Sequence, residues 1–367
     1  MERIVVKIGS SSLTSDEGGL HKPNIQFFAS ELAQLHQQGK QVMLVTSGAV
    51  AAGFREIGYE ARPKLVHQKQ AAAAVGQALL MQAYQEAFLQ YGIVTAQILL
   101  TRNDFSNRKR INNALMTIEE LLSQRIIPII NENDTVSTAE IILKFGDNDH
   151  LSSLVATMTK ASRLVIITDM DGLYTADPRK NPNATKIERV AQISEELLQL
   201  AGGAGSAVGT GGMRSKIEAA RIAMRGGVTT FIGRVQQAGE LLSAIHGHGR
   251  GTYFDTEEHS LPMKKQWLGF HSTPSGTITV DHGAAIALQE RHKSLLPAGV
   301  VSCAGEFHPG DVVEVLNEEG LLIGRGVVNY ASWQLKAAAG LSSDEVERRI
   351  DVQRIEVIHR DEWITLM

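Results

Sequence analysis

Residues 3–12, which read RIVVKIGSSS, place a mainly apolar run, 3–8, directly before a loop of glycine and serine. The run has the length of a strand, and a strand that is apolar on both faces is typical of a parallel sheet covered by helices on both sides. Lys7 lies within this run. Its ammonium group is costly to bury unless an anion compensates it, although the side chain can also reach solvent or meet a structural aspartate.

The same alternation of strand, turn and helix continues to about residue 250. An amphipathic helix begins at Pro23 and ends before Gly39, and a second apolar strand covers 41–46. Later segments repeat the pattern, with helices expected at 69–91, 112–124, from 151, from 214 and at 238–245, and strands at 93–100, 126–130, 164–168 and 228–232. We therefore expect an α/β fold, a three-layer α/β/α domain with a mainly parallel central sheet.

The pattern changes after residue 250. Residues 251–275 contain prolines and turn-rich segments, so we assign them to a linker between a first domain, 1–250, and a second, 276–367. Short β-like segments in the second domain are separated by glycines and turns, at 277–280, 312–316 and 321–328. The second domain is therefore expected to be small and β-rich.

Composition and cysteine content limit the class of protein. Hydrophobic residues make up 43% of the chain and charged residues 21%, which is near the average for globular proteins. The N-terminal apolar run is too short for a signal peptide and no apolar stretch approaches a membrane span, so we expect a cytoplasmic protein with no membrane partner. Cys303 is the only cysteine, which excludes intramolecular disulfides and thiolate zinc clusters.

The net charge of −4 is unevenly distributed along the chain. Residues 276–367 carry 8 Lys and Arg against 14 Asp and Glu, a balance of −6, which leaves +2 for the preceding residues. Nucleic-acid affinity rests largely on Lys and Arg that meet phosphates. The acidic second domain therefore disfavours nucleic acid as a partner, and a salt-sensitive gel shift with tRNA would revive that alternative.

Three loops at expected strand ends have chemistry suited to phosphate, and they cover residues 7–12, 46–49 and 209–216. Ligands of open parallel sheets bind at the carboxyl ends of the strands. The third loop reads GTGGMRSK; its glycines expose backbone N–H groups, and the next helix directs its positive end to the same place. Lys216 can reach the same phosphates, although a flexible surface loop is the alternative interpretation.

Acidic and amide side chains gather in two further segments, 131–134 and 147–149. They can bind an ammonium group, align the lysines or reach a metal-bound phosphate, although a helix start also favours Asp and Asn for capping alone. Thr168 and Asp169 end another strand, where they form either plain turns or part of an adenine and ribose pocket.

These motifs resemble those of the glutamate 5-kinase family, within the amino-acid kinase superfamily. The match spans essentially the whole chain, and several motifs in one order are more specific than any one alone. Residues 276–367 resemble the PUA domain that this family carries, whereas segment 140–145 looks longer than in some members. The matching motifs are VVKIGSSSL (5–13), VTSGAVAAG (45–53), KQAAAAVGQ (69–77), INENDTVSTAEI (130–141), FGDNDHLS (145–152), TDMDGLYTADPR (168–179) and GTGGMRSKIEAA (209–220).

The resemblance implies ATP-dependent phosphorylation of the γ-carboxylate of L-glutamate, the first step of proline biosynthesis. It implies Mg²⁺ as a cofactor, proline as a feedback inhibitor and a homo-oligomer. Lys7 and Lys216 would contact the transferring phosphates, held by Asp149. Glutamate would be bound by Ser47, Asp134, Asn148 and Asn131, and ATP by Thr168, Asp169, Thr210, Gly211, Gly212, Met213, Arg214, Ser215 and Lys216.

A different acceptor, most plausibly N-acetylglutamate, is the alternative within the superfamily. The carboxylate of Asp134 favours a free ammonium group over an acetylated nitrogen, because a buried carboxylate against a neutral amide lacks compensation. A carboxylate acceptor is already an adequate nucleophile, so this reaction requires no Ser–His or Cys–His pair.

Overall fold

The computed structural model describes residues 1–15, 18–101, 104–105, 107–137, 148–176, 181, 183–201, 212–256, 268, 272 and 274–366. The chain forms two units. The first comprises Met1–Asp104 and Arg108–Ser260, and the second consists mainly of Leu261–Met367. Each unit has a hydrophobic core of its own.

The first unit is built on a mainly parallel sheet, as the sequence predicts. Within the described residues its strand order is β3-β4-β2-β1-β5-β9-β10-β8, so β1 lies near the middle between β2 and β5. Only β10 runs antiparallel to a neighbour, β9, among these described pairings. The strands are β1 (Arg3–Ile8), β2 (Gln41–Val45), β3 (Thr95–Leu100), β4 (Ile127–Glu132), β5 (Arg163–Ile167), β8 (Arg189–Val190), β9 (Thr229–Gly233) and β10 (Gly251–Phe254).

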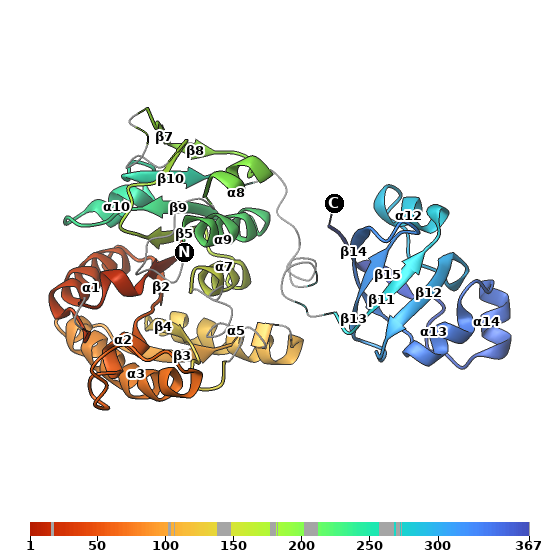
Figure 1. Ribbon diagram of the computed structural model, residues 1–367, viewed down its shortest axis with the longest axis horizontal. Helices are drawn as coiled ribbons and strands as arrows, with labels where there is room; N and C mark the ends of the chain where they lie inside the picture. The colour runs from red at the N-terminus through yellow and green to blue at the C-terminus, as the bar shows by residue number, and fades with distance from the viewer. Residues whose placement is uncertain are drawn as a thin grey trace. The chain divides into compact units, whose positions relative to one another are not determined.

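Helices cover both faces of this sheet (Figure 1). One layer contains α1 (Lys22–Gln37), α3 (Val66–Leu89) and α10 (Glu240–Ile245), and the other contains α5 (Arg108–Ser123), α7 (Asn148–Met158) and α9 (Met213–Arg225). Shorter elements of this unit are α2 (Ala49–Gly53), α8 (Glu195–Ala201), β6 (Leu173–Tyr174) and β7 (Lys186–Ile187). The expected three-layer architecture is confirmed.

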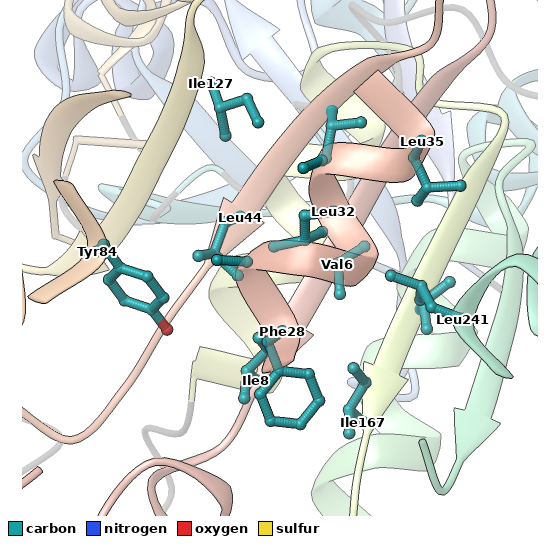
Figure 2. Packing of buried hydrophobic residues seen from close by; sticks show 14 of the residues in the cluster. Val6, Ile8, Phe28, Leu32, Leu35, Leu44, Tyr84, Ile127, Ile167 and Leu241 are labelled. Carbon is teal, nitrogen blue, oxygen red and sulfur yellow. The ribbon is translucent and has the colours of Figure 1, made fainter. Parts of the chain in front are cut away.

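The alternation of side chains along β1 places Lys7 on the functional face. Val6 and Ile8 join the core against α1, where they lie close to Phe28 and Leu32 (Figure 2). Successive side chains of a strand point to opposite faces, so Lys7 points toward the layer that contains α7 and α9. β1 is in contact with α7.

Helices α2 and α3 pack with their backbones in contact. A Cβ added at Gly53 would overlap the backbone of Ala72 and Gly76, and one added at Gly76 would overlap the backbone of Ala49. Glycine is therefore required at both positions. Because α2 begins directly after Ser47 and Gly48, this contact fixes the loop at the end of β2 against α3.

The second unit is a small β-rich fold with three helices among its described residues. Its strands lie in the order β12-β11-β13-β14-β15, and Ile278, Val315 and Trp363 are in its core. The strands are β11 (Gly276–Val280), β12 (Val300–Gly305), β13 (Val312–Leu316), β14 (Leu322–Val328) and β15 (Ile358–Thr365), and the helices are α12 (His282–Gln289), α13 (Ser332–Ala338) and α14 (Ser343–Arg349).

The start of the expected linker needs correction. Gly251–Phe254, which we assigned to the linker, form the fully buried strand β10 of the first unit. The segment pairs with β9, and its four residues are too few to show a strand pattern beside the glycines that precede them. None of the described helices combines the length and the apolarity needed to cross a membrane.

Candidate active site

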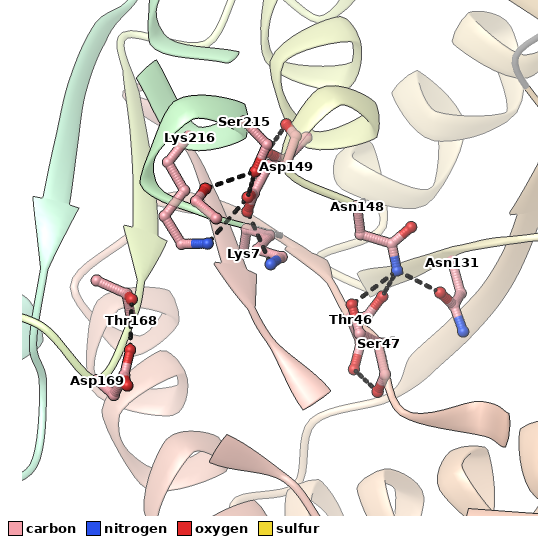
Figure 3. A network of polar contacts seen from close by, with 12 residues as sticks. Lys7, Thr46, Ser47, Asn131, Asn148, Asp149, Thr168, Asp169, Ser215 and Lys216 are labelled. Atoms are coloured by element: carbon pink, nitrogen blue, oxygen red, sulfur yellow. Dashed lines mark hydrogen bonds and ion pairs between the residues drawn. The ribbon is translucent and has the colours of Figure 1, made fainter. Parts of the chain in front are cut away.

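Two lysines meet one aspartate where β1, α7 and α9 come together (Figure 3). Lys7 Nζ lies 2.7 Å from Asp149 Oδ1, and Lys216 Nζ lies 3.1 Å from Asp149 Oδ2. The exposed fraction is 2% for Lys7, 7% for Lys216 and 0% for Asp149. The structure thus brings together all three residues that we expected to form the catalytic group.

Asp149 is ionised in this environment. Burial alone would raise the pKa of its carboxyl group, but the ammonium groups of Lys7 and Lys216 outweigh burial and hold the pKa well below its usual range. The trio therefore carries one excess positive charge in a buried place. Such an arrangement is suited to a phosphate group, whose negative charge complements it.

The first turn of α9 completes the surroundings of Asp149. Ser215 Oγ lies 3.0 Å from Asp149 Oδ2 and 2.8 Å from the carbonyl oxygen of Gly212, so its single proton serves one of the two at a time. Gly212 is the residue before α9, and the exposed Arg214 pairs with Glu218 at 3.1 Å. Two residues expected in this ATP-binding loop, Thr210 and Gly211, lie outside the described residues.

A cluster of amide and hydroxyl groups lies beside the trio, at the ends of β2 and β4 (Figure 3). Asn148 Nδ2 faces three acceptors, the carbonyl oxygen of Thr46, Ser47 Oγ at 2.9 Å and Asn131 Oδ1 at 2.8 Å, which share its two protons. Asn131 and Asn148 are buried. Three of the four residues expected to bind glutamate are therefore in direct contact, and Asn148 connects them to its neighbour Asp149.

The fourth of these residues, Asp134, follows β4 and is partly buried. Burial raises the pKa of its carboxyl group to about 6, against the opposing effect of Arg62. A carboxylate with a raised pKa gains from a cationic ligand, which would compensate its lost hydration. Segment 140–145 and Asp147 lie outside the described residues.

Thr168 and Asp169 follow β5, the strand next to β1. Thr168 Oγ1 donates to Asp169 Oδ1 at 3.0 Å, and the Thr168 backbone N–H donates to Gly233 at the end of β9. Nearby in sequence, the hydroxyl of Tyr174 donates to Asp171 at 2.8 Å. Thr168 and Asp169 lie at the carboxyl end of β5, where the sequence predicts either plain turns or part of an adenine and ribose pocket.

Two contacts from α3 were not expected from the sequence. Gln77 Oε1 accepts a hydrogen bond from Asn131 Nδ2 at 2.8 Å, and the fully buried hydroxyl of Tyr84 lies 3.0 Å from Thr46 Oγ1. Gln77 ends the motif KQAAAAVGQ, and Tyr84 follows two helical turns later on the same face. Polar residues are spread around α3, so no signal in its sequence singles out these two.

The arrangement can hold phosphate next to the cluster of amide and hydroxyl groups. Among the described residues, no group of three or more His, Cys, Asp or Glu side chains is placed to hold a metal ion. The ammonium groups of Lys7 and Lys216 are charges that the described site offers to an anion. Group transfer between two anionic ligands is the chemistry that these features favour.

Comparison with known proteins gives a consistent result. Residues 2–234 match the model of the amino acid kinase family, and residues 276–350 match the PUA domain. The glutamate 5-kinase of Geobacillus kaustophilus (strain HTA426) is 52% identical over 366 residues, covering 100% of this chain and 97% of that protein. The glutamate 5-kinase of Bacillus cereus (strain ATCC 10987 / NRS 248) is 49% identical, with coverage of 100% and 99%.

The fold also resembles that of a solved kinase. Carbamate kinase from Giardia lamblia bound to AMP-PNP aligns with a TM-score of 0.51 at 18% identity, over 70% of this chain and 99% of that one. At this identity the likeness supports the fold alone.

Proposed function

The chain belongs to the amino acid kinase family and, within it, to the glutamate 5-kinases with a C-terminal PUA domain, and we propose that it transfers the γ-phosphoryl group of ATP to the γ-carboxylate of L-glutamate. The products are ADP and glutamyl 5-phosphate, and the reaction opens proline biosynthesis. The observation that carries the mechanism is the buried trio of Lys7, Asp149 and Lys216.

In this mechanism a γ-carboxylate oxygen attacks the γ-phosphorus in line with the oxygen that leaves as part of ADP. One P–O bond forms to glutamate while the bond to the β–γ bridging oxygen breaks. Lys7 and Lys216 stabilise the charge on the transferring group, which is the main task of an enzyme that catalyses phosphoryl transfer. No general base is required, because the acceptor is already ionised at neutral pH.

Asp149 acts through the lysines. Each of its oxygens pairs with one ammonium group, so the carboxylate holds the two cations close to each other. Asp149 also lies in the first turn of α7, where the helix dipole favours a negative charge. Preorganisation of this kind avoids reorientation of charged groups during the reaction.

Glutamate is assigned to the polar pocket beside the trio. Ser47, Asn131 and Asn148 would orient the substrate, and Asp134 would pair with its α-ammonium group. Asp134 is the residue that favours free glutamate over N-acetylglutamate, whose nitrogen carries no charge.

ATP is assigned to the carboxyl ends of β5 and β9. Thr168, Asp169 and residues 210–216 would line this site, with the N-terminal end of α9 directed at the phosphates. Bound Mg²⁺ would neutralise charge on the β- and γ-phosphates, which themselves supply ligands in such sites. Asp149 already pairs with two lysines, so we assign no described carboxylate to the metal.

Feedback inhibition by proline, a homo-oligomeric state and a cytoplasmic location remain predictions from the family.

A comparison of acceptors tests the proposal. Purified protein is incubated with MgATP and glutamate, N-acetylglutamate, aspartate or UMP, and ADP release is followed. Glutamate-dependent release with no comparable activity on the other three supports the assignment. A preference for N-acetylglutamate would retain the kinase mechanism and refute the role of Asp134, whereas release with none of the four would refute the proposed function.

A further inference from the structure

A row of side-chain amides leads from the candidate glutamate pocket to helix α3. Asn148 Nδ2 lies 2.8 Å from Asn131 Oδ1, and Asn131 Nδ2 lies 2.8 Å from Gln77 Oε1. Beyond it, Gln77 Nε2 lies 3.1 Å from Oε1 of the exposed Gln97. Every amide in the row donates in the same direction, from the pocket toward the surface.

Backbone groups determine this direction at two points. The N–H of Glu132 can only donate, and it meets Asn131 Oδ1 at 2.9 Å. The carbonyl oxygen of Thr46 can only accept, and it meets Asn148 Nδ2. A flipped Asn131 or Asn148 amide would place donor against donor or acceptor against acceptor. The main chain thus favours this direction, and Gln77 Oε1, which accepts from Asn131 Nδ2, holds the Asn131 side chain in it.

The direction has a consequence for the ligand. The nitrogen of the Asn148 amide faces Thr46, Ser47 and Asn131, so its carbonyl oxygen points away from them (Figure 3). A carbonyl oxygen accepts hydrogen bonds and repels a carboxylate. The amide of Asn148 is therefore oriented to receive a donor such as an ammonium group.

We propose that Gln77 is a positioning residue for the acceptor substrate: it accepts a hydrogen bond from Asn131 and so keeps the carbonyl oxygen of Asn148 turned toward the ammonium group of glutamate. The inference rests on the proposed function, because it places an amino acid in this pocket. Asn131 is 2% exposed, so loss of its acceptor leaves a buried N–H unsatisfied. Such a loss corresponds to roughly ten- to hundredfold in an equilibrium constant.

Three variants at position 77 distinguish the effect of hydrogen-bond direction on glutamate binding from the effect of side-chain charge. Gln77→Glu keeps an acceptor at the same reach, Gln77→Lys offers only donors, and Gln77→Met offers only a thioether sulfur, which is a weak acceptor. The exposed Gln97 can rotate its amide to donate to a glutamate at this position. If charge alone mattered, Gln77→Lys would favour the anionic substrate and Gln77→Glu would oppose it, which is the reverse of the order that our proposal predicts.

The experiment measures KM for glutamate, KM for ATP, kcat and thermal unfolding for each variant. We expect Gln77→Lys and Gln77→Met to raise KM for glutamate about tenfold or more, Gln77→Glu to stay within about threefold, and KM for ATP to stay within about twofold throughout. Gln82 provides the control, because it lies on the exposed face of α3 and contacts Glu86. Gln82→Lys and Gln82→Glu should resemble the wild type.

A double variant keeps the test valid if Gln77→Lys folds poorly. Asn131→Asp retains acceptors for Glu132 and Asn148, and its second oxygen can pair with a lysine at position 77. The double variant Asn131→Asp/Gln77→Lys should therefore bind glutamate more tightly than Gln77→Lys, or be recovered where that variant is not. Absence of any such rescue would overturn the proposal.

The remaining outcomes are also distinct. Unchanged KM for glutamate in all three variants, a greater loss in Gln77→Glu than in Gln77→Lys, or parallel increases for glutamate and ATP would each overturn the role of Gln77. Wild-type protein that shows no glutamate-dependent turnover would instead refute the proposed function, before any variant is compared.

Discussion

Lys7 and Asp149 form an ion pair with 2.7 Å between Nζ and Oδ1, and both side chains are almost completely buried. Buried ion pairs contribute little net stability, since desolvation opposes the attraction between the charges. The pair belongs to a trio with an excess positive charge, at the carboxyl edge of the sheet. The trio is therefore better explained by a role in anion binding than by the stability of the fold.

Removal of either lysine should impair turnover much more than folding. We expect Lys7→Ala or Lys216→Ala to lower kcat by about 10²–10³, because each removes one preorganised charge from the transition state. Steady-state kinetics with circular dichroism checks this, with the exposed Lys22→Ala as the control. Near-normal kcat in a folded variant would exclude that lysine from catalysis.

Asp149→Asn should cost stability as well as activity. Two buried ammonium groups lose their shared partner, and breaking a buried pair typically costs about 3–5 kcal/mol. The folded pKa of Asp149 is depressed, so its contribution is present above the unfolded pKa of about 3.9 and is lost as pH falls further. The difference in unfolding free energy between wild type and variant, from urea titrations, should be constant above about pH 5 and shrink as pH falls below about 4. A difference independent of pH would contradict this account.

The pH dependence of glutamate binding should report Asp134. Its pKa is raised to about 6 in the free protein, and only the ionised form pairs with an ammonium group. KM for glutamate should therefore rise as pH falls through 6, by up to roughly tenfold per unit. Glutamate itself changes charge little between pH 5.5 and 8.

Asp134→Asn provides the matched control for that titration. The variant should bind glutamate weakly and show a flat profile over this range, which separates Asp134 from the titration of ATP. Because its folded pKa is raised, Asp134 lowers stability as pH rises through about 6, so the variant should be more stable than wild type at pH 8. A variant with the wild-type pH profile would remove Asp134 from the pocket.

Gly76→Ala should disturb the glutamate pocket from a distance. The added Cβ would overlap the Ala49 backbone and force α2 away from α3, at a cost of roughly 1–3 kcal/mol. Since α2 follows Ser47, KM for glutamate should rise while KM for ATP changes less. Ala78→Gly on the exposed face of α3 is the control, with a cost of about 1 kcal/mol from helix propensity. Equal effects on both substrates would contradict a local disturbance.

The sequence was most informative where a local pattern decides structure. The expected strand at 3–8 corresponds to β1, because an apolar run bounded by Gly9 has few alternatives. The loops that leave the carboxyl ends of parallel strands lie at one edge of the sheet. This rule predicts that Lys7 and Asp149 lie at the same edge. The contact of both lysines with one carboxylate depends on strand register and helix packing, which the residues alone do not specify. The prediction that Asp149 holds both lysines therefore came from the family resemblance.

Other features depend on tertiary contacts that no local pattern contains. β10 is a strand because β9 pairs with it, since its four residues carry no periodicity of their own. Polar and apolar residues are spread around helix α3 without a distinct apolar face, so its sequence does not reveal which face meets the site. Gln77 and Tyr84 consequently passed as ordinary members of an alanine-rich helix, and their roles emerge only from their partners Asn131 and Thr46.

The most direct test of the central claim is to measure whether an oxygen atom of the γ-carboxylate is transferred to phosphate. Glutamate labelled with ¹⁸O in its γ-carboxylate is incubated with MgATP and the protein, hydroxylamine traps the acyl phosphate, and mass spectrometry measures the label in released phosphate. Attack by the γ-carboxylate on the γ-phosphorus predicts one ¹⁸O atom in each phosphate formed. Phosphate without label, formed together with ADP, would show that water is the acceptor and would contradict the account.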